Sequence, residues 1–429
     1  MTRAYSFSAL GASAMIACGG SNANTMPGGA GDLGASGNSS GTSSSGGAVG
    51  MAGSTSTGGK LSSAGAPPVS LAGRPNTGIS EGTPGVWEDI TPSGVSLQQQ
   101  DPGGGDNYGV QDVLADPARS TDLYAFICYQ GVWRSSDYGD SWTQVNAGSN
   151  WGKPWGTAIQ PNPDRDPTKA PVLYAGGSNP VGLLRSLDFG VTWTEHPLPM
   201  DFGDFRYQQV YSIDINPYDS QHIIVAFHEA PDVGESTDGG KTWVKHLTPA
   251  EDGGTSYYPF FVQTGDAATT RKTWLAVPQE TGNSRALRTT DGGASWTKLN
   301  QFQHHHGSAQ LFDAGGGLIF LSAMQPAGIH KSTDYGSTWT SLSAASSGVV
   351  TASKKNLYAS VGVGYAMASS GFDPQLVTAP RDNDTAWVPM TRPPGMFDGA
   401  KRMAVTHDEA HDLVVSGNWH AGIWRYIEP

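Results

Sequence analysis

Aromatic and hydrogen-bonding side chains recur along this sequence beside short apolar runs, and the combination suits the recognition of sugars. The C–H faces of pyranose rings stack on Trp and Tyr, while amides, imidazoles and carboxylates bind the hydroxyl groups. The candidate substrate-binding residues are Tyr108, Tyr129, Trp151, Trp155, Arg206, Tyr207, His228, Tyr258, His305, Arg402, Trp419 and His420. Any one of these aromatic residues is more often part of a core, so the prediction depends on the whole set sharing one face.

Carboxylates near these residues could hydrolyse a glycosidic bond. The reaction needs two carboxyl groups about 5 to 10 Å apart, one protonated as the acid and one ionised as the base or nucleophile. The candidate catalytic residues are Asp112, Glu229 and Glu280. A carboxylate in a loop is more often solvated or salt-bridged than catalytic, so hydrolysis and binding without turnover both stay open.

A run of three histidines, residues 304–306, could contribute to a metal site together with His228 and His420. Neutral imidazoles are common metal ligands. Because adjacent residues of a strand point to opposite faces, only the first and third histidines of the run, or the middle one alone, could face such a site. The sequence assigns no cofactor and leaves the metal question open.

A polysaccharide lyase is a further alternative. Its base, a His or Tyr, removes a proton next to a uronate carboxylate while an Arg or Lys neutralises the charge. Arg206 with Tyr207, or a histidine with Arg402, could provide this pair.

A short pattern that occurs five times indicates the elements that position these residues. It reads [Ser/Thr]-x-Asp-x-Gly-x-[Ser/Thr]-Trp and spans residues 135–142, 186–193, 236–243, 289–296 and 332–339. The Asp accepts hydrogen bonds from backbone N–H groups of the turn, the Gly takes a positive φ, and the Trp opens the outgoing strand. Five such turns predict five similar hairpins in a repeat fold.

The pattern resembles the Asp-box, or bacterial neuraminidase repeat, and the resemblance covers the chain from about residue 86 to its C-terminus. In Asp-box proteins this turn joins the third and fourth strands of a β-propeller blade, on the face away from the ligand. The resemblance therefore implies an all-β propeller in which the repeats belong to the scaffold.

Proteins with this repeat include sialidases, xyloglucanase-type glycoside hydrolases, arabinan-degrading enzymes, sortilin-like receptors and photosystem assembly factors. Bacterial sialidases carry an Arg-Ile-Pro motif, which is absent from this sequence and argues against sialidase activity. Xyloglucanase-type enzymes resemble the chain more in repeats and aromatic content. They bind substrate between two seven-bladed propellers, however, and this chain has room for one, so no catalytic residue is carried over.

The repeat spacing predicts a seven-bladed β-propeller. Its inner strands are expected to begin near Val110, Gly156, Val210, Pro259, Gly307, Val349 and Met403. The chain ends after the third strand of the last blade, and residues 86–90 are expected to supply the fourth and close the ring. Six or eight blades are alternatives, whereas a two-sheet sandwich would not explain a repeat of about 45 to 50 residues.

In this topology, the loops that precede the inner strands and the loops between second and third strands share one face, here named the loop face. The Asp-box turns lie on the opposite, turn face. The candidate residues above fall on the loop face, apart from Asp112 on the first inner strand.

The first 85 residues are predicted to lie outside the propeller. Residues 1–18 resemble a bacterial signal peptide with a lipobox-like sequence ending in Cys18. Residues 19–85 consist mainly of Gly, Ser, Ala, Thr and Pro, a composition typical of a disordered tether. We expect a propeller of residues 86–429 that is either a lipoprotein of the bacterial cell surface or outer membrane or a secreted protein, without a structural disulfide.

Charge and composition limit the partners. With 38 acidic and 25 basic residues the net charge is −13, which argues against nucleic-acid binding. No apolar stretch is long enough for a transmembrane helix, so membrane contact is expected only through a lipid anchor. The sequence favours a monomeric propeller that engages a polysaccharide or oligosaccharide and hydrolyses it as a glycoside hydrolase. The alternatives are a non-catalytic carbohydrate- or protein-binding propeller and a lyase.

Overall fold

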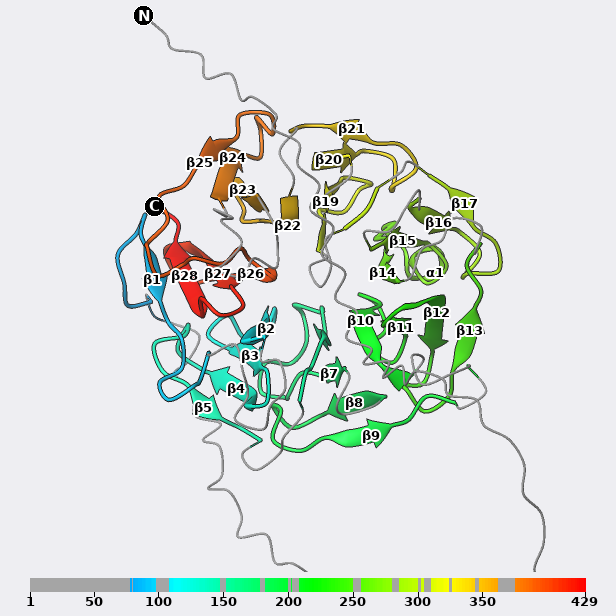
Figure 1. Ribbon diagram of the computed structural model, residues 1–429, viewed down its shortest axis with the longest axis horizontal. Coiled ribbons are helices and arrows are strands. Elements are labelled where there is room, and N and C mark those ends of the chain that lie inside the picture. The colour runs from blue at the N-terminus through cyan, green and yellow to red at the C-terminus, as the bar shows by residue number, and fades with distance from the viewer. Residues whose placement is uncertain are drawn as a thin grey trace, which may run out of the picture. The chain divides into compact units, whose positions relative to one another are not determined.

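The computed structural model describes residues 78, 80–97, 108–146, 152–177, 182–199, 202, 208–249, 256–279, 285–299, 302–304, 310–323, 326–343, 347–361 and 375–429. These residues form seven four-stranded antiparallel sheets and one short helix, α1 (Ala267–Thr270). In the described part of the chain, no helix is long and apolar enough to cross a membrane. The sheets surround a central axis like the blades of a propeller (Figure 1).

Each sheet is one blade, and its first strand lies nearest the axis. Blade 1 contains β2 (Val110–Ala115), β3 (Leu123–Ile127), β4 (Gly131–Ser135) and β5 (Thr143–Gln144), and blade 2 contains β6 (Gly156–Ile159), β7 (Leu173–Gly176), β8 (Leu183–Ser186) and β9 (Thr194–His196). Blade 3 contains β10 (Val210–Ile215), β11 (Ile223–Phe227), β12 (Ala230–Ser236) and β13 (Val244–His246), and blade 4 contains β14 (Tyr257–Phe261), β15 (Trp274–Pro278), β16 (Leu287–Thr289) and β17 (Thr297–Lys298). Blade 5 contains β18 (Leu311–Asp313), β19 (Ile319–Ala323), β20 (Gly328–Ser332) and β21 (Thr340–Ser341). Blade 6 contains β22 (Ser347–Ala352), β23 (Asn356–Val361), β24 (Gln375–Pro380) and β25 (Val388–Pro389). Blade 7 contains β26 (Arg402–His407), β27 (Asp412–Gly417), β28 (Ile423–Ile427) and β1 (Trp87–Asp89).

The seven-bladed architecture and its mode of closure are confirmed. Strand β1 pairs with β28, with Trp87 opposite Tyr426 and Asp89 opposite Trp424. The rings of Trp87 and Tyr426 lie 5.3 Å apart between centroids. The last blade is therefore completed by the start of the folded chain, which leaves the first and last strands joined in one sheet.

The core lies between neighbouring blades. Tyr124 and Phe126 of blade 1, for example, pack with Leu173 and Leu184 of blade 2. Because each blade is covered on both faces by its neighbours, its second strand is buried on both sides. This explains why β3 and β11 are continuous apolar runs rather than alternating ones.

The first Asp-box shows why the repeat forms a turn. Ser135 Oγ donates to Asp137 Oδ1 at 2.8 Å, and the Ser141 backbone N–H donates to the same oxygen at 2.9 Å. Gly139 adopts a φ of +95°, which favours glycine. Equivalent contacts recur in the other four boxes. The carboxylate thus accepts hydrogen bonds from residues of its own turn, as expected for a scaffold element.

Residues just before β1 also contact the propeller. Ser80 Oγ donates to Asp408 Oδ2 at 2.8 Å, and the Glu81 carbonyl accepts from the Arg425 guanidinium. The contacts of the folded part therefore begin before residue 86, within the segment expected to be a tether. Cys18 and the signal-like sequence lie outside the described residues.

Candidate functional site

A small polar pocket lies among the inner strands, with a volume of about 30 Å³. It is lined by Asp112, Trp155, Gly156, Thr157, Tyr211, Ser212, Ile213, Tyr258, Lys401 and Arg402. These residues belong to blades 1, 2, 3, 4 and 7 or to the loops leading into them. A pocket of this size holds one or two water molecules or a small polar substituent, but not a sugar ring.

Asp112, on β2, is 2% exposed and is held through both carboxylate oxygens. Thr157 Oγ1 donates to Oδ2, and the Val113 backbone N–H donates to Oδ1 at 2.9 Å. Arg402 Nε lies 3.5 Å from Oδ1. The carboxylate therefore ties blades 7, 1 and 2 together, and none of its hydrogen bonds and ion pairs within the described residues involves a second carboxylate.

Lys401 precedes β26 and is 7% exposed. Its Nζ donates to the Trp155 carbonyl at 3.2 Å and lies 5.6 Å from the centre of the Trp419 ring. Burial lowers the pKa of Lys401 to about 8, although the Asp112 carboxylate acts in the opposite direction. The Asp112 carboxylate thus offsets only part of the cost of burying the Lys401 ammonium group.

Arg402 is the first residue of β26, and its side chain is 33% exposed within the pocket. Its one ion pair within the described residues is the Nε contact with Asp112. The two Nη groups, which carry four N–H donors, make no hydrogen bond to these residues. Arg402 is therefore positioned by Asp112 while its outer edge can bind a ligand.

Beside the pocket, five rings form what we name the aromatic row: Trp155, Tyr211, His228, Tyr258 and His304. The ring centroids are 4.6 Å apart for Trp155 and His228, 5.1 Å for His228 and Tyr211, 5.6 Å for Tyr211 and Tyr258, and 5.6 Å for Tyr258 and His304. Trp155 and His228 are half-buried, whereas the other three rings are buried. Burial lowers the pKa of His228, which favours the neutral imidazole.

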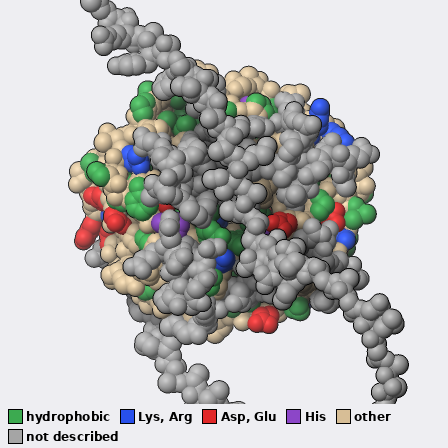
Figure 2. Space-filling view, viewed as in Figure 1, with side chains coloured by type: hydrophobic (Ala, Val, Ile, Leu, Met, Phe, Trp, Pro, Cys, Tyr) green, Lys and Arg blue, Asp and Glu red, His purple; other side chains and the backbone are tan. Residues whose placement is uncertain are grey.

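Two further rings extend the site on the other side of Lys401. Tyr108 and Trp419 meet edge to face at 6.5 Å, and Lys153 Nζ lies 4.7 Å from the centre of the Tyr108 ring. Aromatic and cationic groups from blades 1, 2 and 7 thus adjoin the pocket. On the face seen in Figure 2, hydrophobic, basic, acidic and histidine side chains are all exposed near the middle of the ring.

The structure places several sequence candidates in the turns between second and third strands. Tyr129, Glu229 and Trp419 occupy corresponding turns of blades 1, 3 and 7 with positive φ values of 59°, 55° and 47°. Glu229 is exposed. His420 lies apart from the aromatic row, with Nδ1 3.4 Å from Asp398 Oδ2. Trp151, Arg206, Tyr207, Glu280 and His305 lie outside the described residues.

The described residues contain no cluster of side chains that would support the metal hypothesis. Within the ranges given above, no group of three His, Cys, Asp or Glu side chains could hold a metal ion. His228 contacts Trp155, His304 contacts Tyr258, and His420 contacts Asp398. His228 and His304 thus both belong to the aromatic row, whereas His420 contacts Asp398.

Sequence reasoning missed Tyr211, Lys401 and Asp214 as site residues. Tyr211 occupies the second position of its inner strand, as Tyr258 does in the next blade, and this correspondence could have identified it. Asp214 accepts a hydrogen bond from the Phe261 backbone N–H at 2.6 Å. Burial raises the pKa of Asp214 to about 6, while that hydrogen bond, another from Ile215 and the Arg402 charge act in the opposite direction.

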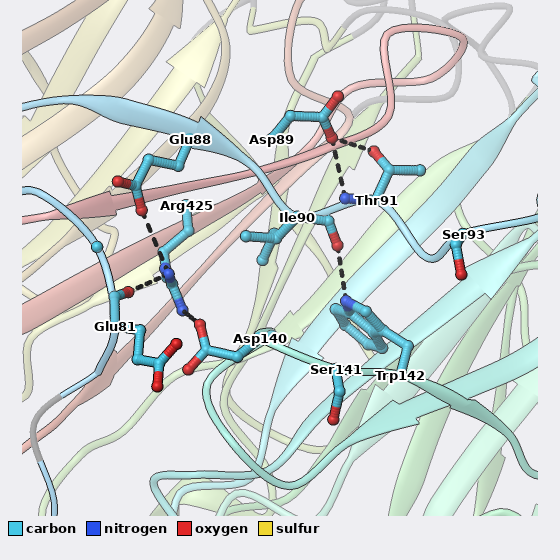
Figure 3. A pocket seen from close by; sticks show the side chains of 12 residues that line it. Glu81, Glu88, Asp89, Ile90, Thr91, Ser93, Asp140, Ser141, Trp142 and Arg425 are labelled. Atoms are coloured by element: carbon cyan, nitrogen blue, oxygen red, sulfur yellow. Dashed lines mark hydrogen bonds and ion pairs between the residues drawn. The ribbon is translucent and has the colours of Figure 1, made fainter.

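A larger cavity of about 610 Å³ lies at the seam between blades 1 and 7 (Figure 3). Arg425 Nη1 contacts Asp140 Oδ1 at 2.6 Å, and Nη2 lies 3.2 Å from Glu88 Oε2. Trp142 Nε1 donates to the Ile90 carbonyl at 2.6 Å. These contacts join the first Asp-box to the closing strand, so this cavity belongs to the closure of the ring.

The fold and its repeats define the chain as a seven-bladed Asp-box β-propeller. The family described as BNR-Asp box repeat matches residues 132–145, around the first box. A xyloglucanase from Acetivibrio thermocellus is 25% identical over 252 residues, which cover 54% of this chain and 24% of that protein. The chain thus spans about a quarter of the length of this curated relative.

Solved structures share the fold. A xyloglucanase from Xanthomonas campestris superposes with a TM-score of 0.54 and 17% identity, covering 79% of this chain and 53% of that one. YCF48 bound to D1 peptide superposes with a TM-score of 0.50 and 12% identity, covering 80% of this chain and 97% of that one. At these identities the likeness concerns the fold alone.

Proposed function

We propose that this chain binds a polysaccharide across its loop face, with the half-buried rings of the aromatic row, Trp155 and His228, stacking on sugar rings. The observation that carries the proposal is that half-buried Trp155 lines a polar pocket and that its ring lies 4.6 Å from the ring of half-buried His228. Sugar sites combine apolar ring faces with a few well-placed polar groups. Here the rings supply the stacking surface, while Lys401, Arg402 and Asp112 supply charged hydrogen-bonding groups.

The relatives support a polysaccharide as the ligand class. The curated relative and one of the solved structures are named xyloglucanases, enzymes that act on a polysaccharide. Because this chain spans only part of each, the proposal takes from them the class of ligand and no specific linkage. We place the protein at the bacterial cell surface, through acylation of Cys18, or outside the cell.

Hydrolysis is the second candidate function, and Asp214 favours it. A carboxyl group with a pKa raised to about 6 is partly protonated in mildly acidic solution, as a general acid must be. Asp112 is engaged by Thr157 and Arg402, which leaves it less suited to act as nucleophile or base. Glu229 and Glu280 on the loop face stay candidates for the second carboxylate.

Two other functions follow from the same fold and are distinguished by the same assay. A propeller that binds protein would retain no glycan, and the YCF48 structure carries a bound peptide on a related fold. A lyase would use Tyr207 or a histidine as the base and would release unsaturated uronates.

The test is affinity electrophoresis of the full chain through gels containing xyloglucan, mixed-linkage glucan, arabinan or polygalacturonate. New reducing ends and absorbance from unsaturated products are followed in parallel. Trp155→Ala removes a half-buried ring of the aromatic row, and Tyr218→Ala removes a 49% exposed ring on the turn face. We expect retardation by at least one glycan that Trp155→Ala weakens and Tyr218→Ala leaves unchanged.

New reducing ends that are lost in Asp214→Asn would establish hydrolysis in addition to binding. Unsaturated products would establish a lyase. Absence of retardation and of product on every glycan would overturn the carbohydrate proposal and favour a protein partner.

A further inference from the structure

Two neighbouring cations line the central pocket of a strongly acidic chain. The whole sequence has a net charge of −13, yet Lys401 and Arg402 both line this pocket, and Asp112 is the one acidic residue among its described lining residues. Lys153 adds a third cation at the adjoining Tyr108 ring. The net charge of these described residues is therefore positive, whereas the net charge of the whole chain is negative.

Among the described residues, Asp112 does not occupy all the N–H donors of these cations. Asp112 contacts Nε of Arg402, and within the described part of the chain neither Nη group makes a hydrogen bond. Lys401 uses one N–H donor on the Trp155 carbonyl and retains two others. Asp214, which lies in the electrostatic field of Arg402, does not line the pocket, and its pKa near 6 reduces its negative charge in mildly acidic solution.

Size limits what these donors can receive. A volume of about 30 Å³ accommodates a carboxylate group or a water pair but excludes a pyranose ring. Trp155 and Tyr258 belong both to the pocket lining and to the aromatic row. A sugar ring stacked on this row would therefore hold its substituents at the mouth of the pocket.

We propose that this pocket is a subsite for the carboxylate of an acidic sugar, bound by the Nη edge of Arg402 and by Lys401, so that the preferred glycan contains uronate residues. The inference rests on the proposed function and adds to it a substrate class. A planar guanidinium matches the two oxygens of a carboxylate, and such charge-assisted hydrogen bonds are stronger than those to neutral hydroxyls. Asp112 acts here as a positioning residue that orients Arg402.

The test compares acidic polysaccharides with their own neutral derivatives. Polygalacturonate, alginate and xanthan are used before and after reduction of their carboxyl groups to hydroxymethyl groups, which keeps chain and linkage unchanged. Dissociation constants are measured for the full chain at low ionic strength, with dextran sulfate as a polyanion without carboxylates.

Three variants accompany the wild type. Arg402→Gln removes the charge and the fork, and Arg402→Lys retains the charge alone. Lys169→Gln makes the same charge change at a residue that is 77% exposed in the loop between β6 and β7, on the turn face. Urea unfolding of each variant establishes that it is folded.

We expect at least one acidic glycan to bind about tenfold more tightly than its reduced form. Arg402→Gln should remove this difference, Arg402→Lys should retain part of it, and Lys169→Gln should retain all of it. Equal binding of acidic and reduced forms would overturn the subsite while leaving glycan binding intact. The subsite would also be overturned if dextran sulfate bound as tightly as the acidic glycan. The same holds if the difference in affinity between the acidic and reduced forms were unaffected by Arg402→Gln. Absence of binding to every glycan, reduced or not, would overturn both proposals.

Discussion

Arg402 Nε lies 3.5 Å from Asp112 Oδ1 and joins the inner strand of the last blade to that of the first. Thr157 of the second blade donates to the other oxygen of the same carboxylate. Three consecutive blades thus meet at one residue beside the central pocket. Asp112 has a structural reason for its position, and it orients the arginine that we propose as the ligand-binding cation.

Replacing this carboxylate should therefore lower stability and acidic-glycan affinity together. Asp112→Ala leaves the Thr157 hydroxyl and the Arg402 guanidinium without their shared acceptor, at an expected cost of about 1 to 3 kcal/mol in the free energy of unfolding. Urea unfolding measures this cost. Glu195→Ala, at an exposed carboxylate on β9, is the control and should change stability by about 0.5 kcal/mol or less. A cost for Asp112→Ala no larger than that of the control would contradict the bridging role.

Asp214 should make stability depend on pH in the range between its unfolded and folded pKa values. Its folded pKa of about 6 lies above the ordinary value of 3.8, so the protonated form is favoured in the native state. Its contribution is fully present below about pH 4 and is lost as the pH rises through 6, an effect of about 3 kcal/mol at most. Relative to wild type, Asp214→Asn should gain stability between pH 4 and pH 7, as urea unfolding at both values would show. A constant difference between the two proteins would argue against the raised pKa.

Lys401 should impose an upper pH limit on the binding of acidic glycans. Its pKa of about 8 lies below the ordinary 10.5, so its positive charge is lost as the pH rises through 8. The charged and titratable groups that act on it are Asp112, Arg402 and Cys128. Affinity for an acidic glycan should fall between pH 7 and pH 9, while affinity for its reduced form stays level. Lys401→Met should show low affinity at both pH values, and an unchanged fall in this variant would assign the titration to another group.

The Asp-box carboxylates should contribute to stability and leave ligand binding unchanged. Asp238 accepts from the Thr242 backbone N–H at 2.9 Å and from Ser236 Oγ at 2.9 Å, and its pKa is lowered to about 2. Asp238→Ala should cost about 1 to 2 kcal/mol in urea unfolding because these donors lose their acceptor. The same variant should retain wild-type glycan affinity, and loss of affinity without loss of stability would place the ligand on the turn face.

The fold could be predicted because the Asp-box pattern occurs five times and each copy indicates the same hairpin turn. Each box fixes a turn through contacts among its own residues, such as Ser135 with Asp137, and these contacts do not depend on distant parts of the chain. The fourth strand of the last blade was also predictable, because residues 86–90 resemble the strands that follow the boxes. The starts of four inner strands differed by a few residues, since those of blades 4 to 7 begin at Tyr257, Leu311, Ser347 and Arg402.

The site was less accessible to sequence reasoning because its contacts join separate blades. Trp155 and His228 belong to different blades, and nothing in either local sequence predicts that their rings meet. Lys401 looks like an ordinary exposed lysine until the Trp155 carbonyl and the Trp419 ring enclose it. The raised pKa of Asp214 likewise arises from burial beside Phe261 of the next blade.

The central claim, that the loop face binds a polysaccharide, is tested most directly by hydrogen exchange of the full chain with and without the glycan that retards it most in affinity electrophoresis. Slower exchange is predicted in residues 152–156, 208–211, 256–258 and 400–402, on the loops that lead into the inner strands. Exchange in the Asp-box turns, residues 188–192, 238–242 and 334–338, should stay unchanged. Protection confined to those turns, or protection that Trp155→Ala leaves intact, would contradict the claim.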